Sequence, residues 1–304
     1  MNNTAIGRIR QWFRPQLPLW ACEFTSREIV VAGVDGKRSH VQGKAKVELP
    51  AGVFKGSLGD ANINESTQIR AYLQAALKAA SFKGSEICVV IPDEAARVSF
   101  VSAETLPKTE AEQITFLRWK LKKTVPFDVD TAQIAFQVVG NHPNESKGGK
   151  ATGCDLIVVL SPRNVVEEYE NLFDELGIHA GYVVPSSLAA LNLLKTPADD
   201  VLFVKVVPDC VTTTVLQNKQ IKFYRRVTDL GLYESVYPTV LYYQDKLGGT
   251  ALRQMVVCGS EAQVRSPGQE LQHKTGIPFV QLEPRNIEDL YKPALGAVHL
   301  SWAN

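Results

Sequence analysis

The sequence has little that would place it in a membrane or give it redox chemistry. No apolar run in its 304 residues reaches the length of about 18–20 that crosses a bilayer, and the longest runs, such as 156–160 and 201–204, have the size of a strand. The N-terminus has no run resembling a signal-peptide core. The five cysteines are an odd number and widely spaced in apolar segments, which predicts reduced, buried thiols in a cytoplasmic protein. They are Cys22, Cys88, Cys154, Cys210 and Cys258.

An excess of charge of one sign and the usual catalytic motifs are also missing. Lys and Arg number 33 against 32 for Asp and Glu, a net charge of +1, so nucleic acid is not expected as a partner. The five histidines lack metal-ligand spacing, and no Gly-x-Ser-x-Gly elbow occurs. The stretch 147–150 resembles a phosphate loop, but Asn144 stands where its first glycine belongs, and Ala151 replaces the Ser or Thr. We therefore predict no catalytic residue and no metal ligand.

A repeated order of elements organises the chain. Strands are predicted at 19–24, 28–34 and 38–49, with a hairpin turn at Asp35-Gly36, then a helix capped by Ser66 or Thr67 and a buried strand at 86–91. The same order returns as strands at 201–207, 211–216 and 220–227, a helix ending at Gly248-Gly249, and a strand at 255–258. A duplicated three-strand meander with a crossover helix is typical of an actin-like, two-lobed fold with a cleft between the lobes.

About a hundred residues between the two copies form a separate unit. Strands are predicted at 97–102, 133–140 and 154–160, with a polar loop at 142–153. Thr109 can cap a helix that Pro126 ends, and a second helix opens at Ser161-Pro162 and stops at Gly177. A third helix, at 187–194, leads through the linker 196–200 to the second copy.

Residues of this inserted unit carry a family resemblance. Its helix, Pro-Phe turn and following strand resemble those of the inserted subdomain in PilM, the type IV pilus assembly family. The residues are Leu117-Arg118-Trp119-Lys120, Val125-Pro126-Phe127-Asp128-Val129-Asp130 and Ile134-Ala135-Phe136-Gln137-Val138-Val139. Four further stretches match in the same order: Val89-Val90-Ile91-Pro92, Leu106-Pro107, Ser161-Pro162-Arg163 and Leu176-Gly177-Ile178. The likeness runs from about residue 19 to residue 300, and the cytoplasmic domain of GspL, from type II secretion, is similar too.

The resemblance implies a fold and a division of the chain. PilM proteins resemble FtsA, so an actin-like (RNase H-like) α/β fold is expected, with a small α+β subdomain inserted in the first lobe. The implied parts are an N-terminal amphipathic tail (1–17), the first lobe (18–93), the insert (94–178), a return to the first lobe (179–198), the second lobe (199–292) and a C-terminal helix returning to the first lobe (293–304).

The implied function is that of a non-catalytic cytoplasmic scaffold, peripheral to the inner membrane. It would bind the cytoplasmic N-terminal segment of a PilN-like bitopic inner-membrane protein and other proteins of a pilus or secretion platform. Two alternatives stay open: an actin-like ATP-binding protein or ATPase, and a GspL-type component of a type II secretion platform.

The family's nucleotide-binding turns are altered here. An actin-like cleft holds Mg-ATP with acidic residues and with glycines whose backbone N–H groups approach the phosphates. The family's Asp-Ile-Gly-Ser-Ser becomes Glu23-Phe24-Thr25-Ser26-Arg27, its second Asp-Ile-Gly becomes Lys205-Val206-Val207 followed by Pro208, and its Gly-Gly turn becomes Cys258-Gly259-Ser260. We treat Glu23, Thr25, Ser26, Lys205, Val207, Gly259 and Ser260 as degenerate nucleotide-site positions. Productive binding of ATP and magnesium is disfavoured, and Glu23 and Lys205 can instead form an ion pair across the cleft.

Partner-binding residues are predicted from family architecture, in a groove between the first lobe and the insert. They are Val98, Phe100, Ile114, Phe116, Arg118 and Trp119. The basic cluster of Arg118, Lys120, Lys122 and Lys123 is either a solvated face or a docking surface for the partner or for acidic lipid.

The N-terminal segment 5–14 is amphipathic. Ile6, Ile9, Trp12 and Phe13 recur at helical spacing, and Arg8, Arg10 and Arg14 interleave with them. The segment could touch an anionic membrane surface, or it could pack on its own domain.

Overall fold

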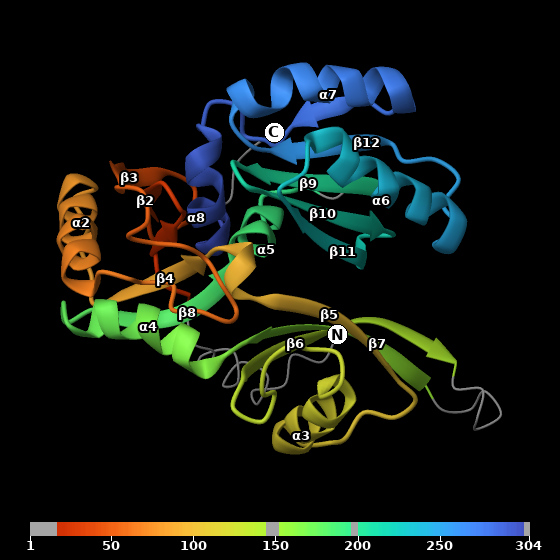
Figure 1. Cartoon of the computed structure of the whole chain (residues 1–304), viewed down its shortest axis with the longest axis horizontal. Helices are drawn as coiled ribbons and strands as arrows, with labels where there is room; N and C mark the ends of the chain where they lie inside the picture. The colour runs from red at the N-terminus through yellow and green to blue at the C-terminus, as the bar shows by residue number, and fades with distance from the viewer. Residues whose placement is uncertain (1–16, 144–151, 196–199, 301–304) are drawn as a thin grey trace.

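Three β-sheets organise the chain, in a computed structural model that describes residues 17–143, 152–195 and 200–300 (Figure 1). The amphipathic segment 5–14 lies outside the described residues, as do most of the polar loop 142–153 and of the linker 196–200. Among the residues described, no helix combines the length and the apolarity needed to cross a bilayer.

The first lobe is built on a five-stranded sheet of order β3-β2-β1-β4-β8. Its strands are β1 (Trp20–Phe24), β2 (Glu28–Val34), β3 (Val41–Glu48), β4 (Glu86–Ile91) and β8 (His179–Pro185). The first three form an antiparallel meander, whereas β1, β4 and β8 run parallel. Helices α2 (Ser66–Ala79) and α4 (Arg163–Asp174) bury their apolar stripes on one face of this sheet.

The second lobe repeats this arrangement with the order β11-β10-β9-β12-β13. Its strands are β9 (Val201–Val207), β10 (Cys210–Gln217), β11 (Gln220–Thr228), β12 (Gln254–Cys258) and β13 (Phe279–Gln281). Helices α6 (Leu232–Lys246) and α7 (Glu261–Thr275) cover one face. The predicted duplication is therefore confirmed: in each lobe a meander pairs through its first strand with a parallel strand that follows a crossover helix.

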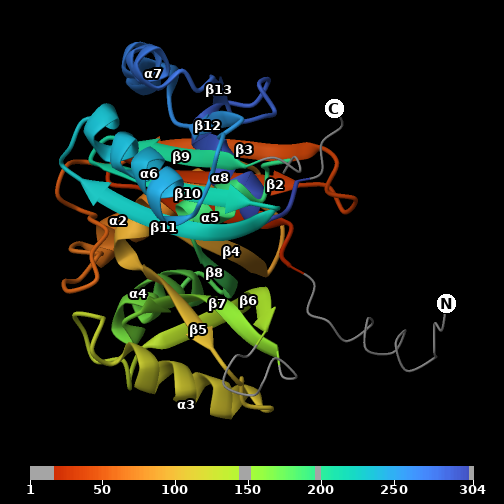
Figure 2. The same cartoon turned by 90° about the vertical axis from the view of Figure 1, so that its right-hand side faces the viewer.

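The insert is a smaller sheet of order β5-β7-β6 beside the first lobe (Figures 1 and 2). Its antiparallel strands are β5 (Arg97–Ala103), β6 (Gln133–Pro143) and β7 (Thr152–Ser161). Helix α3 (Glu110–Leu121) packs Leu117 and Leu121 on one face. As predicted, Thr109 caps this helix, in a capping box with Glu112.

Two short helices fill the space between the lobes. Helices α5 (Ser186–Leu191) and α8 (Lys292–Ala297) share one buried cluster with Ala21 and Val30 of the first sheet and with Phe203 of the second. They approach so closely that a Cβ on Gly296 would lie 2.0 Å from the carbonyl oxygen of Ala189. The lobes are thus joined by a continuous apolar core.

Some elements differ from prediction for local reasons. Strand β8 was not predicted, because Gly181 and Tyr182 break its apolar pattern, at the point where its pairing with β4 shifts register. Helix α7 and strand β13 were also missed, since Pro267 and Gly268 lie within α7 and are usually helix breakers. Gly268 is needed there, because a Cβ would lie 2.3 Å from the Phe279 ring.

The predicted hairpin turn is confirmed, and the predicted cap of α2 is wrong. Asp35 and Gly36 begin the loop 35–40 of the antiparallel β2–β3 hairpin, where the Arg38 N–H donates to the Asp35 carbonyl at 2.8 Å. The left-handed φ of 56° falls on Arg38, and the Asp35 carboxylate accepts hydrogen bonds from the N–H groups of Ser39 (2.7 Å) and His40 (3.0 Å). Helix α2 starts after Glu65 with no side-chain cap, so Ser66 and Thr67 are not its cap.

The contact between α5 and α8 predicts a large effect of one methyl group. Replacement of Gly296→Ala should lower the free energy of unfolding by about 2 kcal/mol or more, because the helices must separate to admit a Cβ. The urea midpoint should fall accordingly. Gly59→Ala is the control, since no atom lies within 4 Å of its Cβ position, and an equal loss in both variants would contradict this account.

Candidate functional site

A cavity of about 460 Å³ lies between the lobes, near the carboxyl ends of β1, β4 and β8. Open α/β sheets place their ligands at such strand ends. The predicted positions Glu23, Thr25, Ser26, Lys205 and Val207 all line this interlobe cavity, the first three from the first lobe and the other two from β9. The structure therefore brings both altered turns to one place.

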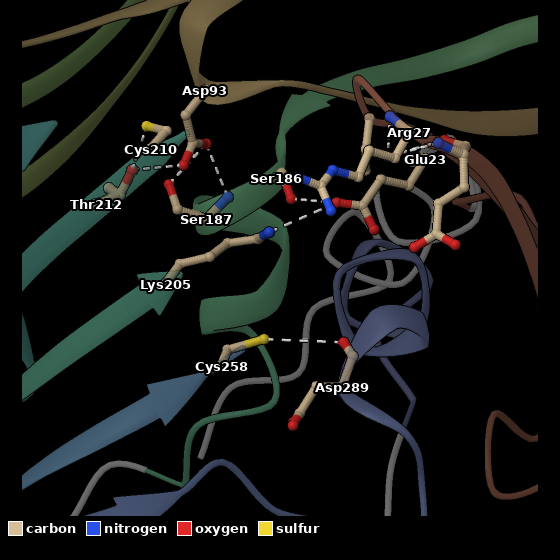
Figure 3. A network of polar contacts seen from close by, with 12 residues as sticks. Glu23, Arg27, Asp93, Ser186, Ser187, Lys205, Cys210, Thr212, Cys258 and Asp289 are labelled. Atoms are coloured by element: carbon tan, nitrogen blue, oxygen red, sulfur yellow. Dashed lines mark hydrogen bonds and ion pairs between the residues drawn. The ribbon is translucent and has the colours of Figure 1, made fainter. Parts of the chain in front are cut away.

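An ion pair crosses the cleft in this cavity. The Lys205 Nζ lies 3.7 Å from the Glu23 Oε1, and the two side chains are only 7% and 3% exposed. The Ser186 hydroxyl donates a further hydrogen bond to Glu23 Oε1 (Figure 3). An ammonium thus lies directly against the only carboxylate that the altered turns retain.

The surroundings shift the pKa of both partners. Burial raises the pKa of the Glu23 carboxyl, and the Lys205 ammonium and the Ser186 hydroxyl oppose this only in part. Burial by itself lowers the pKa of Lys205, but nearby acidic groups, Glu23 first among them, outweigh it, and the pKa ends above its ordinary value. Lys205 is therefore held as an ammonium ion.

The first turn uses its own backbone donors. The Thr25 Oγ1 accepts hydrogen bonds from the N–H groups of Arg27 (3.3 Å) and Glu28 (3.0 Å), and the Thr25 N–H donates to the Glu28 carbonyl at 3.0 Å. A hydroxyl-closed turn of this kind satisfies its N–H groups locally. Of the turn 25–28, only the Ser26 N–H is left to face a ligand.

The second turn and the rest of the lining also disfavour phosphate. Pro208 has no N–H, so the β9–β10 turn lacks a backbone donor directly after Val207. Besides Glu23, four carboxylates line the interlobe cavity, against the cations Lys55 and Lys205. The four are Asp93, Glu94, Asp209 and Asp229.

Asp93 ties the lobes together beside the ion pair. It lies in the short 3₁₀ turn η1 (Asp93–Ala95) after β4. Its Oδ1 accepts hydrogen bonds from the N–H and the hydroxyl of Ser187, both at 2.9 Å, and its Oδ2 accepts one from the Thr212 hydroxyl of β10 at 2.7 Å (Figure 3). Arg226 of β11 donates to the Asp93 carbonyl at 2.8 Å. We call this set the Asp93 clasp.

Sequence reasoning missed the clasp and Ser186. The available signal was positional: Asp93 follows the predicted buried strand 86–91, and Ser186-Ser187 follows Pro185 at the start of a helix. Nothing in the local sequence joins these residues to Thr212, which lies more than a hundred positions from Asp93.

The third predicted turn lies elsewhere. Ser260 lines a second cavity of about 730 Å³, beside α7 and β13, which shares no lining residue with the interlobe cavity. Gly259 has a packing role, since a Cβ there would lie 2.9 Å from the Val206 Cβ, and its carbonyl accepts a hydrogen bond from Gln281. Glycine is therefore required here for strand and helix packing.

The predicted partner-binding residues fall on two faces of the insert. Buried Val98 and 38% exposed Phe100 lie on the face of β5 opposite to α3, whereas Ile114, Phe116, Arg118 and Trp119 belong to α3 itself. They do not line one common groove. Trp119 is 70% exposed, and the Lys120 ammonium lies 5.5 Å from its ring centroid. Other members of the basic cluster are engaged locally: Arg118 with the Ala132 carbonyl and Lys122 with Asp130.

A groove does exist between the insert and the first lobe, with different walls. It holds a cavity of about 250 Å³, which we call the insert groove. The insert contributes Gln137, Ile157 and Val159, and the first lobe contributes Tyr182, Leu188 and Leu191. Across the described parts of the chain, no group of acidic, histidine or cysteine side chains has an arrangement able to hold a metal ion.

Neither a family model nor a curated protein matches this sequence, but solved structures do. One is the "PilM-PilN type IV pilus biogenesis complex", with a TM-score of 0.71 and 13% identity over 94% of this chain and 98% of that chain. Another is the cytoplasmic domain of EpsL, an inner-membrane component of the type II secretion system of Vibrio cholerae, with a TM-score of 0.54 and 11% identity over 92% of this chain and 94% of that chain.

A third is a Bacteroides thetaiotaomicron protein described as having an actin-like ATPase fold, with a TM-score of 0.56 and 9% identity over 90% of this chain and 93% of that chain. These likenesses establish the actin-like, two-lobed α/β fold. The predicted resemblance to PilM and to the cytoplasmic domain of GspL, of which EpsL is the structure matched here, is confirmed in three dimensions.

The buried ion pair makes a pH-dependent prediction. Replacement of Lys205→Met leaves the Glu23 carboxylate buried without its cation and should cost about 3 kcal/mol or more at pH 8. The pKa of Glu23 in the folded state then rises further above its unfolded value, so stability falls as pH rises between those two values. Chemical denaturation at pH 5 and pH 8 should show the smaller loss at pH 5.

The matched control is the double variant Glu23→Gln with Lys205→Met, which removes both charges. It should recover most of the loss at pH 8 and show little additional pH dependence. A single variant that loses the same amount at both pH values would contradict the ion-pair account.

Proposed function

We propose that this protein is a non-catalytic scaffold of a type IV pilus assembly platform. It binds the cytoplasmic N-terminal segment of a PilN-like inner-membrane protein in the insert groove, and it does not use ATP. The observation that carries the proposal is the contrast between two sites in one actin-like fold: the interlobe cavity is bridged by the protein's own charges, while the insert groove is lined mainly by apolar residues and by no charged one.

The electrostatics of the interlobe cavity support the non-catalytic part of this proposal. A Mg-triphosphate needs carboxylates for the metal and N–H donors or cations for the phosphates. Here Lys205 occupies the metal-side position, the first turn has used most of its donors, and the acidic lining repels phosphate. The residues present do not fit the nucleotide that many actin-like proteins hold.

The insert groove has the features of a site for an extended peptide. Strand β8 is at the edge of its sheet, and among the described strands only β4 pairs with it. An incoming segment could add main-chain hydrogen bonds to this edge while its side chains enter the apolar pocket between β7 and α5. Tyr182, 40% exposed on β8, lies in this groove.

A type II secretion platform is the second candidate. It is favoured by the likeness to the cytoplasmic domain of EpsL. The same groove would then receive the cytoplasmic segment of a different inner-membrane protein.

The charge argument predicts that Mg-ATP does not stabilise the protein. The melting temperature should change by less than about 1 °C at millimolar Mg-ATP relative to magnesium alone, because the cavity does not bind the nucleotide. A ligand that did bind, present at a hundred times its Kd, would add about 2.7 kcal/mol to the free energy of unfolding. Differential scanning fluorimetry measures this. A rise of several degrees in the melting temperature would contradict the proposal and favour the ATPase alternative.

The groove argument predicts a position-specific loss of partner binding. Replacement of Tyr182→Ala should weaken binding of the PilN-like N-terminal peptide about tenfold or more, since it removes an aromatic contact from the groove. Isothermal titration calorimetry measures the affinity. Tyr242→Ala is the matched control, because Tyr242 is 39% exposed but lies on α6, and it should leave the affinity unchanged. Equal affinities for all three proteins would place the peptide elsewhere.

A further inference from the structure

The path by which the chain enters the first lobe passes beside the insert groove. The Arg38 guanidinium holds the carbonyls of Leu17 and Pro18 and that of Val298. A Cβ on Gly181 of β8 would lie 3.3 Å from the Pro18 Cγ, so Pro18 contacts this edge strand. Tyr182, which lines the groove, is the next residue of β8.

The residues that precede this anchor can reach the groove. An extended chain covers up to about 3.3–3.6 Å per residue, so the four steps from Leu17 to Phe13 span up to about 14 Å. A tethered segment acts at an effective concentration of about millimolar for a short linker. A contact of residues 5–14 with the insert groove would therefore be formed in most molecules if its intrinsic Kd lies below this effective concentration.

The chemistry of the segment and of the groove is complementary. Residues 5–14 carry Ile6, Ile9, Trp12 and Phe13, and apolar side chains line the groove, among them Ile157, Leu188 and Leu191. Cavities for small ligands usually measure about 300–1,000 Å³, so the smaller volume of about 250 Å³ favours a few inserted side chains. The Glu86 carboxylate lies 3.9 Å from the Gly181 Cβ position and supplies an anion beside the entry path, where Arg14 would pass.

We propose that residues 5–14 of this chain dock in the insert groove through Trp12 and Phe13 and compete there with the partner's segment. Only the consequence of this inference rests on the proposed function: the scaffold would block its own groove, and the partner's segment would have to displace residues 5–14. The docking itself is independent of any partner. A membrane surface is the rival destination of the same segment.

Hydrogen–deuterium exchange tests the docking without a partner. The full chain is compared with a chain lacking residues 1–16, with the double variant Trp12→Ala, Phe13→Ala, and with the control Gln11→Ala. Peptides covering β8 and α5 should exchange at least about tenfold more slowly in the full chain and in the control than in the other two. A synthetic peptide of residues 1–16 added to the shortened chain should restore the protection.

A second measurement separates the two proposals. The shortened chain should bind the PilN-like peptide about tenfold more tightly than the full chain, because the competing segment is gone. Unchanged exchange on removal of residues 1–16 overturns the docking proposal, whatever the partner does, and so does binding of the segment to anionic vesicles with no effect on β8. If removal of residues 1–16 speeds exchange in β8 and α5 but the PilN-like peptide does not bind, the docking is supported and the proposed function is contradicted.

Discussion

The contact between Glu23 and Lys205 is the interaction on which the arrangement of the two lobes depends. Both charges are almost wholly buried, so each lobe supplies a group that is costly to bury without the other. A wider or twisted cleft would separate them and leave both unpaired. The pair therefore restricts the lobes to a narrow range of relative positions, and the Asp93 clasp, with its hydroxyl and backbone donors from both lobes, narrows that range again.

This restriction has a bearing on the insert groove. The groove is walled by β7, β8 and α5, and β11 of the second lobe reaches it through Ile221. Ser187, at the start of α5, also meets the Tyr224 hydroxyl of β11 at 3.0 Å. The polar contacts of the cleft thus hold α5 and β11 against each other, and both of these elements also line the groove. A surface that is held in place before its ligand arrives loses less entropy on binding.

The sequence predicted the parts that depend on local pattern. Buried runs such as 86–91 and 201–207 and the cap at Thr109 are set by residues close in the chain, and they appear where expected. The meeting of Glu23 and Lys205 followed from matching two turns to one family site. The Asp93 clasp, strand β8 and the walls of the insert groove depend instead on contacts between distant segments, which periodicity does not encode. Gly259 was singled out for a possible ligand, and its close approach to Val206, which also requires glycine, is another contact between distant segments.

The position of α8 has a consequence for how the protein is made. Its residues cover the inner face of β1, β2 and β4, yet they follow almost the whole described chain in the order of synthesis. A ribosome adds about 5–20 residues per second, so the strands emerge many seconds before their cover. During that interval the apolar face around Ala21 and Val30 is bare, and a chain truncated before residue 292 would keep it so. The nascent first lobe therefore exposes an apolar face, which is prone to aggregation, until α8 has been synthesised.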